Sequence, residues 1–186
     1  SLLTSNIFFD LDGVYGRTEL AETLRALIAK KAKGNARFLA SMARNALLRT
    51  PPIGFFKDFV LEPDGRHSRA MNLKRRGTAP LTDLIRVHAL AIGSRNRNSF
   101  DRLQDIIKAN VLPPGRGRDL KDALEFISMV RVRNQANDLM TGQVPDNSIE
   151  PEMLSEFERK NLRDAFLILS HAQKYLKFRY QSGRLN

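Results

Sequence analysis

Two long segments with helical periodicity close this sequence, and they constrain its fold more than any other feature. One runs from about residue 119 to 140, and the other from about residue 151 to 180. Apolar residues in the second segment recur at three- and four-residue spacing, which is the pattern of one buried helix face. The linker over residues 142–147 is short, so we expect the two helices to pack antiparallel.

Helical patterns also fill most of the preceding chain, with breaks at Gly34, Pro51, Gly93 and Pro113. Between them, residues 55–62 and 69–74 resemble two strands. They are joined by the turn sequence Pro63-Asp64-Gly65, which predicts a β-hairpin. Alternating strand–helix units are absent after residue 20, which argues against a doubly wound α/β fold. We therefore predict an all-α fold: a bundle of about six helices with one β-hairpin and an N-terminal strand remnant.

The composition limits the classes of function. The chain has 186 residues and no cysteine, which excludes disulfides and thiolate metal sites, and its 3 histidines lack metal-ligand spacing. Its net charge of +11 favours anionic partners: nucleotides, nucleic acid, an acidic protein surface or a membrane surface. A basic surface whose charges are only solvated explains the same composition equally well.

Neither a membrane span nor a secretory signal is visible. No apolar run approaches the ~20 residues that a membrane helix needs. The first five residues have neither a basic start nor a long apolar centre. We expect a cytoplasmic protein without a membrane partner.

The N-terminal stretch over residues 6–16 carries the first candidate site. An apolar run leads into Asp10 and Asp12, and glycines follow at positions 13 and 16, which predicts a strand, a tight turn and then a helix. A single strand is not stable alone, and the chain starts with Ser, so we expect a piece of a larger protein whose remaining sheet lies elsewhere.

Asp10 and Asp12 suggest one hypothesis about function, that of a phosphohydrolase. The run Asp10-Leu11-Asp12-Gly13-Val14 resembles the first motif of haloacid dehalogenase-like phosphohydrolases. In that class the first Asp is the nucleophile, the second is a general acid/base, and Mg²⁺ bridges to the phosphate. The class also needs a parallel sheet with further polar strand ends, and the helical remainder of this chain offers no strands to carry them. The hypothesis is kept as an alternative.

The polar end of the segment at 119–140 is a second candidate. Its apolar stripe continues into polar residues that share one helix side: Arg131, Asn134, Gln135 and Asp138. Arg133 lies near them in the sequence. Arginine and amide groups in this place indicate a lined pocket or an interface. The alternative is a helix that extends beyond the core and has a solvated end.

A basic set is the third candidate: Lys74, Arg75, Arg76, Arg86, Arg95, Arg97 and Arg102. Guanidinium groups and helix N-termini bind phosphate well, and a helix that begins near Pro80 after a flexible Gly77 is a fair anion site. Two alternatives remain. One is a solvated surface in which Arg86 pairs with Asp83, and Arg102 with Asp101 or Asp105. The other is a basic helical module that binds nucleic acid.

His88 lies on the apolar side of its helix, next to Leu84, Ile85 and Ile92. A histidine in such a place is more often a core residue with a hydrogen-bond partner than a metal ligand. We expect a buried structural histidine.

Several short runs follow one another along the chain in a specific order. The runs are Phe8-Phe9-Asp10, Val14-Tyr15-Gly16, Pro52-Ile53-Gly54-Phe55-Phe56, Phe59-Val60-Leu61, residues 72–84 with Arg86, residues 98–103, residues 131–135 and Pro145-Asp146-Asn147. Their order resembles the nucleotidyltransferase substrate-binding domain family, which forms the C-terminal part of bacterial signal-transduction proteins. These proteins also carry a cyclic-nucleotide-binding domain, paired CBS domains and a nucleotidyltransferase core related to the PII uridylyltransferase.

The resemblance implies a helical bundle packed against a nucleotidyltransferase core. In such cores three carboxylates hold Mg²⁺ and the nucleoside triphosphate, and Asp10 falls on the strand that would bring the third. Asp10 is therefore the expected catalytic and metal-binding residue. The Gly-Ser…Asp-x-Asp segment that supplies the other two carboxylates is not in this sequence. We expect no nucleotidyl transfer by this chain alone, and Mg²⁺ only in the full-length enzyme.

The resemblance also implies a substrate-binding side formed by Arg95, Arg102, Arg131, Arg133 and Gln135, to which the basic set adds Lys74, Arg76 and Arg86. Two positions depart from the family pattern: Asp12 stands where an Arg is common, and Asn134 where a His is. Residues 1–16 would be the strand remnant of the core, and residues 17–186 the helical substrate-binding domain.

The expected partners follow from this division. They are the nucleotidyltransferase core, the cyclic-nucleotide-binding and CBS domains upstream of it, and a nucleotide or acceptor substrate. A homodimer is a further expectation, because an apolar surface left exposed without the core favours self-association.

Overall fold

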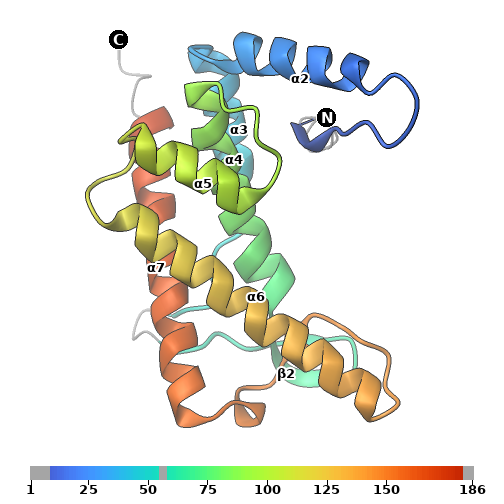
Figure 1. The fold of residues 1–186 in the computed structure, drawn as a ribbon. Coiled ribbons are helices and arrows are strands. Elements are labelled where there is room, and N and C mark those ends of the chain that lie inside the picture. The colour runs from blue at the N-terminus through green and yellow to red at the C-terminus, as the bar shows by residue number, and fades with distance from the viewer. Residues whose placement is uncertain (1–8, 55–57, 182–186) are drawn as a thin grey trace. The chain divides into compact units, whose positions relative to one another are not determined.

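The structure is a computed structural model that describes residues 9–54 and 58–181 (Figure 1). Its α-helices are α2 (Glu19–Ala32), α3 (Ala36–Ala46), α4 (Ala79–Ile92), α5 (Ser99–Lys108), α6 (Arg116–Met140) and α7 (Glu156–Gln181). A small antiparallel sheet has the strand order β1 (Glu62–Asp64), β2 (His67–Asn72), β3 (Ser148–Ile149). The fold is mostly helical, which confirms the predicted class. No helix in the described ranges is long and apolar enough to cross a membrane.

The described chain forms two compact units. The first contains residues 9–48, 82–117 and 175–181, and the second contains residues 49–81 and 118–174. Helices α4, α6 and α7 contribute residues to both units. The domain boundary expected after residue 16 stays a prediction.

The first unit consists of α2, α3, α5, most of α4 and the last turns of α7. Local signals set its helix starts: the side chain of Asn35 accepts a hydrogen bond from the backbone N–H of Phe38, and that of Asn98 accepts one from Phe100. Such caps satisfy backbone donors that the first helical turn leaves free. The apolar core includes Leu39, Met42, Leu84, Ile85, Leu103 and Ile106, all buried.

His88 lies in this core, as predicted. It is fully buried, and its Nδ1 lies 3.1 Å from the hydroxyl of Tyr180. The rings of Tyr180 and Tyr175 lie 5.4 and 6.0 Å from the imidazole, measured between centroids.

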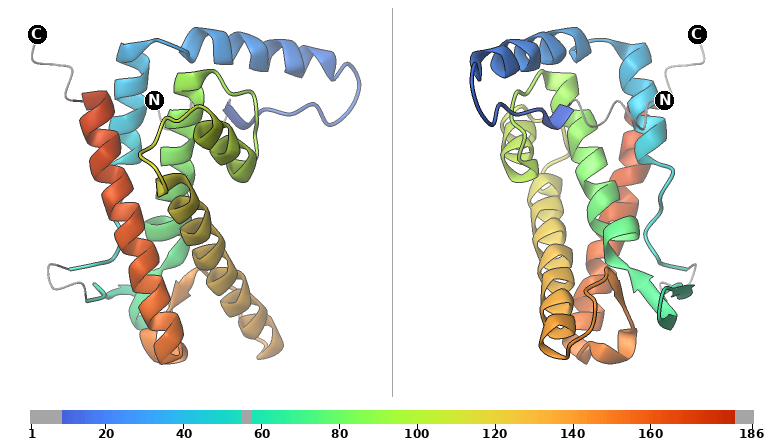
Figure 2. Two further views of the ribbon diagram at one scale, coloured as in Figure 1. Left: turned by 60° about the vertical axis from the view of Figure 1, so that its left-hand side comes forward. Right: turned by 90° about the vertical axis from the view of Figure 1, so that its right-hand side faces the viewer.

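The second unit joins the sheet to most of α6 and α7. These two helices run in opposite directions, as predicted, and the segment between them contains β3 (Figure 2). β3 pairs with β2, with Met71 opposite Ile149. The core of this unit includes Met71, Leu73, Ile127, Leu162, Phe166 and Leu169.

The N-terminal strand prediction is wrong for the part that the structure describes. Residues 6–8 lie outside the described residues, Phe9 and Asp10 belong to a 3₁₀ turn, and residues 11–14 have no regular structure. A strand needs a neighbour to bond with. The three strands of the described chain pair only with one another.

The hairpin is confirmed but is shorter than predicted. Its strands begin at Glu62 and His67, and the turn is Gly65-Arg66. Residues 55–57 of the predicted first strand lie outside the described residues. Beyond them, Phe59 forms only an isolated bridge with Ile53.

The helix predicted to begin near Pro80 is confirmed, since α4 begins at Ala79, but its start is not a free helix end. The helical backbone begins at Leu73 and continues through a π-helical turn, Lys74–Thr78, into α4. Gly77 is buried inside this turn. The flexible glycine and free helix N-terminus expected for anion binding are therefore absent at this place.

Candidate functional site

Two arginines of the first unit converge on Asp10. The Nη2 of Arg86 lies 2.6 Å from Oδ2 of Asp10, and the Nη1 of Arg102 lies 2.8 Å from Oδ1. The arginine side chains are only 7% and 3% exposed, whereas that of Asp10 is 43% exposed. Each carboxylate oxygen therefore faces one buried guanidinium group.

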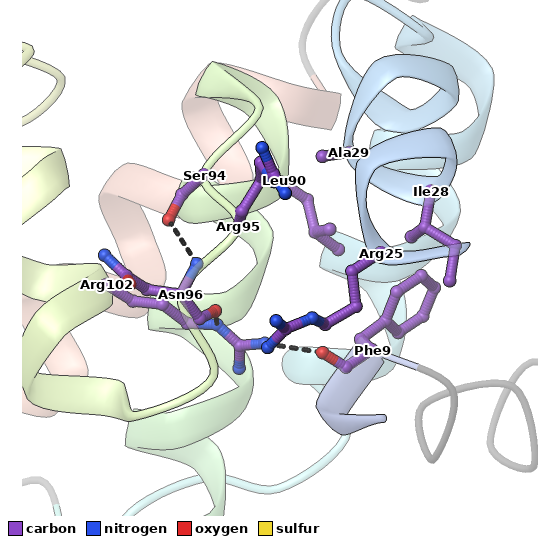
Figure 3. Close-up of a pocket in the computed structure, with 9 residues that line it drawn as sticks. All are labelled: Phe9, Arg25, Ile28, Ala29, Leu90, Ser94, Arg95, Asn96 and Arg102. Carbon is purple, nitrogen blue, oxygen red and sulfur yellow. Dashed lines mark hydrogen bonds between the residues drawn. The ribbon is translucent and has the colours of Figure 1, made fainter. Parts of the chain in front are cut away.

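The fold fixes both arginines from their other sides. On α4, Arg86 donates to Asp83 one turn earlier over 2.6 Å, the pair that the sequence predicted. The Nε of Arg102 donates to the carbonyl of Asn96, and its Nη2 donates to the carbonyl of Phe9, each over 2.7 Å (Figure 3). The guanidinium planes are thus held before any ligand is considered.

Arg102 does not form the predicted pair with Asp101 or Asp105. Instead, Asp105 accepts hydrogen bonds from Ser94 and Asn96 over 2.6 and 2.9 Å. These bonds hold the loop before α5 in the shape that presents the carbonyl of Asn96 to Arg102. The prediction failed because it considered only neighbours in the same helix.

The charges at this centre balance. Burial lowers the pKa of Arg102, and the nearby carboxylate of Asp10 opposes that shift. An arginine remains a cation in proteins even so. The two cations therefore face two anions, Asp10 and Asp83, and without Asp10 one buried positive charge would be left over.

An open cleft of about 760 Å³ lies beside Asp10. Its rim carries exposed arginines in ion pairs: Arg97 with Asp12, and Arg95 with Glu22 over 3.5 Å. The lining residues are Asp10, Asp12, Glu22, Arg25, Arg95, Asn96, Arg97, Asn98 and Asp101, which enclose about 760 Å³. A smaller pocket of about 20 Å³ has Phe9, Arg25 and Arg102 in its wall (Figure 3). It is large enough for one water molecule.

Four of the predicted site residues are therefore brought together in the first unit: Asp10, Arg86, Arg95 and Arg102. The other five belong to the second unit: Lys74, Arg76, Arg131, Arg133 and Gln135.

The predicted residues of α6 make contacts within the second unit. Arg131 donates to the hydroxyl of Thr78 over 3.0 Å, and the amide of Gln135 lies 3.4 Å from that of Asn147. Arg133 pairs with Glu158. This contact and the backbone N–H of Ser155 lower the pKa of Glu158 to about 2. These polar side chains thus connect α6 to neighbouring segments of the second unit, and the solvated helix end considered as an alternative is not observed for them.

Arg76 and Lys74 lie on the π-helical turn. The Nε of Arg76 donates to the carbonyl of Thr50 over 3.2 Å, and its Nη1 lies 3.4 Å from Glu62. Arg75 also pairs with Glu62. Lys74 is exposed.

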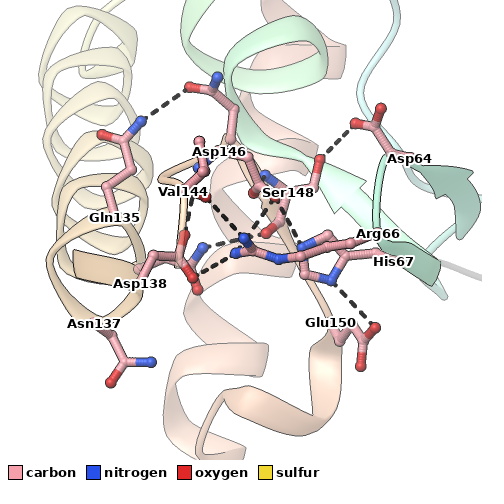
Figure 4. Close-up of polar contacts among 12 residues, drawn as sticks. Asp64, Arg66, His67, Gln135, Asn137, Asp138, Val144, Asp146, Ser148 and Glu150 are labelled. Atoms are coloured by element: carbon pink, nitrogen blue, oxygen red, sulfur yellow. Dashed lines mark hydrogen bonds and ion pairs between the residues drawn. The ribbon is translucent and has the colours of Figure 1, made fainter. Parts of the chain in front are cut away.

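A polar cluster in the second unit was missed at the sequence level (Figure 4). Arg66 in the hairpin turn lies 2.5 Å from Asp138, and His67 lies 3.1 Å from Asp146 and 3.2 Å from Glu150. This cluster connects the hairpin to the end of α6 and to the segment that follows it. The available signal was a basic turn, Arg66-His67, and an acidic linker between the two long helices.

Asp64 extends this cluster at the end of β1. It accepts hydrogen bonds from the hydroxyl of Ser148 on β3 and from Asn72 on β2. These two donors, Ser148 first, lower the pKa of Asp64. The carboxylate therefore links all three strands of the sheet.

The residues around Asp10 do not fit Mg²⁺. Both carboxylate oxygens already face guanidinium groups, whose charge repels a cation. In the ranges that the structure describes, no three His, Cys, Asp or Glu side chains are arranged to hold a metal. The Mg²⁺ of the full-length enzyme and the metal role of Asp10 stay predictions. Asp12, the other carboxylate of the phosphohydrolase hypothesis, is also paired with an arginine.

Comparison with known families gives one match. A family model described as "Putative nucleotidyltransferase substrate binding domain" matches residues 36–180. The matched range contains Arg86, Arg95 and Arg102 but not Asp10 or α2. Searches of curated proteins and of solved structures give no match.

Proposed function

This chain belongs to the nucleotidyltransferase substrate-binding domain family, and on that basis we propose that it is the helical module that holds the substrate of a nucleotidyltransferase. The observation that carries the proposal is the match over residues 36–180, which includes most of the described chain. The arginine-rich cleft of the first unit supports it, because nucleotides and many of their acceptors are anions.

We assign the substrate contacts to the rim of that cleft. The side chains of Arg95 and Arg97 are 58% and 39% exposed there, and their partners Glu22 and Asp12 are also exposed. Ion pairs at such a surface contribute little to stability, so a multivalent anion can displace them at small cost. Arg131 and Gln135 are bonded inside the second unit and would support the fold instead.

The reaction itself belongs to a partner in this proposal. The Gly-Ser…Asp-x-Asp segment is not in this sequence, so the chain alone does not transfer nucleotides. Its partners are a nucleotidyltransferase core that supplies the Mg²⁺ site, together with the cyclic-nucleotide-binding and CBS domains of a bacterial signal-transduction protein in the cytoplasm. The chain's own residues bind and orient the substrate for that core.

Calorimetric titration of the chain with ATP and UTP tests the binding. The double variant Arg95→Ala/Arg97→Ala should weaken the affinity at least about tenfold, since one charge-assisted hydrogen bond is worth about 1.5–3 kcal/mol. Arg133→Ala is the matched control, because it removes an exposed, ion-paired arginine of the second unit. Equal losses in both variants would contradict the assignment of the cleft.

Transfer activity tests the division of labour. With Mg²⁺ and labelled ATP or UTP, the chain alone should label no acceptor, whereas the protein that includes the core should. Robust turnover by the chain alone would refute the proposal.

A further inference from the structure

Arg86 and Arg102 have the geometry of a preformed anion site. They come from α4 and α5, are almost fully buried, and are fixed by Asp83 and by the carbonyls of Phe9 and Asn96. Their free ends point at one place, where two oxygens of a single anion can be bound. Paired guanidinium groups of this kind match both carboxylate and phosphate.

Asp10 satisfies this site incompletely. Its Oδ1 pairs with Nη1 of Arg102 over 2.8 Å and its Oδ2 with Nη2 of Arg86, but the buried Nε of Arg86 has no hydrogen-bond partner among the described residues. A planar carboxylate has two oxygens, whereas a phosphate group presents three in a tetrahedral arrangement. A phosphate can therefore use the donor that Asp10 leaves free.

Asp10 comes from a different part of the chain than the two arginines. Both arginines lie inside the range that matches the family, whereas Asp10 lies outside it. After its 3₁₀ turn, the chain from residue 11 to 14 has no regular structure. Asp10 also lines the open cleft, so a ligand there can reach the place that its carboxylate holds.

We propose that Arg86 and Arg102 bind a phosphate group of the substrate, and that Asp10 occupies this site as an intramolecular substitute. That the phosphate belongs to the substrate rests on the proposed function; the site itself does not. Without Asp10 the two buried cations face only Asp83, and the remaining charge favours binding of another anion. Because Asp10 is tethered, it competes at a high effective concentration and weakens the apparent affinity for phosphate.

Removal of the Asp10 carboxylate tests this proposal directly. Asp10→Ala in the full chain should bind inorganic phosphate and ATP at least about tenfold more tightly than the unmodified chain in calorimetric titration, since a tethered competitor is gone. Glu62→Ala is the matched control, because Glu62 also bridges two arginines, Arg75 and Arg76, but these are 50% and 20% exposed instead of buried. A general gain of positive charge would raise the affinity equally in both variants, and that result would overturn the proposal.

A second variant tests whether phosphate binding depends on the guanidinium geometry or only on the positive charge. Arg102→Lys, placed on the Asp10→Ala background, keeps the charge but loses the planar fork, so the gained phosphate affinity should disappear. Retained affinity would place the phosphate elsewhere. Sodium acetate is a further arm: if acetate binds Asp10→Ala as tightly as phosphate does, the site is made for a structural carboxylate and the proposal fails.

Hydrogen exchange of the unmodified chain covers the case in which Asp10→Ala does not fold. Saturating phosphate should displace Asp10 and speed amide exchange over residues 11–16, while exchange in the hairpin stays unchanged. No change over residues 11–16 would overturn the proposal. If phosphate binds as expected but ATP and UTP gain nothing over it, the site stands and the proposed function fails.

Discussion

His88 is a titratable side chain that lies fully buried in the first unit. Burial, helped by the charge of Arg179, lowers its pKa to about 3. One ring nitrogen meets the hydroxyl of Tyr180, and the other, Nε2, has no hydrogen-bond partner among the described residues. The imidazole is therefore held neutral in the folded state, as a structural group of the first unit.

This pKa predicts a dependence of stability on pH. Between pH 6.5, the ordinary pKa, and about pH 3, the unfolded chain binds a proton at His88 that the folded chain does not. Stability therefore falls on acidification, by about 2 kcal/mol from pH 7 to pH 5. Urea denaturation across this range measures it, and His88→Phe should remove the dependence. His171→Gln, at an exposed histidine, is the control; an unchanged dependence in His88→Phe would contradict the prediction.

At the scale of elements, a glycine lets the π-helical turn lie close to its neighbours. A Cβ on Gly77 would lie 2.9 Å from Cγ2 of Ile127 on α6 and 3.3 Å from Cε1 of Phe166 on α7. All three residues belong to the second unit. The turn that precedes α4 is thus set by packing against two other helices.

We predict that Gly77→Ala destabilises the protein by about 1–2 kcal/mol. Overpacking of this kind costs roughly 1–3 kcal/mol, and the better helix propensity of alanine offsets up to about 1 kcal/mol. Denaturant unfolding measures the change. Gly54→Ala is the control, because a Cβ there meets nothing closer than 3.7 Å. A neutral Gly77→Ala would show that the contact can relax.

Helix α2 offers a candidate interface for the expected homodimer. Leu20, Leu24 and Leu27 share one helix side and are 59%, 40% and 49% exposed, whereas the buried side carries alanines. Its first turn is acidic and its last turn basic. An antiparallel pair of α2 helices would bury the leucines and place opposite charges together.

Self-association should therefore depend on these leucines. Sedimentation velocity should show a dimer of the chain that the triple change to glutamine, Leu20→Gln/Leu24→Gln/Leu27→Gln, converts to monomer. Met129→Gln/Val132→Gln alters an exposed apolar pair on α6 and should leave the dimer intact. A chain that is monomeric before any change, or a dimer that survives the triple change, would rule out this interface.

At the scale of the whole molecule, the charge of +11 overstates the free positive surface. Many candidate arginines are already ion-paired with carboxylates, among them Arg76, Arg86, Arg95, Arg102 and Arg133. Binding to a nucleic-acid backbone would have to break several of these pairs.

The nucleic-acid alternative can be tested through this difference. Fluorescence anisotropy with single-stranded RNA and duplex DNA should give dissociation constants above about 1 µM at physiological salt, the range of non-specific binding. Tighter binding than this at the same salt would favour a nucleic-acid-binding module over a substrate-binding one.

Local patterns predicted most helices and one part of the site. The apolar spacing identified α6 and α7, because this signal acts within a few residues. The pair Asp83–Arg86 followed from their spacing along one helix. β3 could not be predicted in this way, since a two-residue strand has no period and exists only because β2 lies beside it.

The sequence by itself determined the helical class, the hairpin, the buried histidine and the family. It also named Asp10 and, on a different ground, the basic set that contains Arg86 and Arg102. Only the tertiary structure decided that these three meet, because their contacts join residues 76 positions apart or more, where no sequence period reaches. For the same reason, only the tertiary structure showed that Arg131 and Gln135 form hydrogen bonds within the second unit, with Thr78 and Asn147.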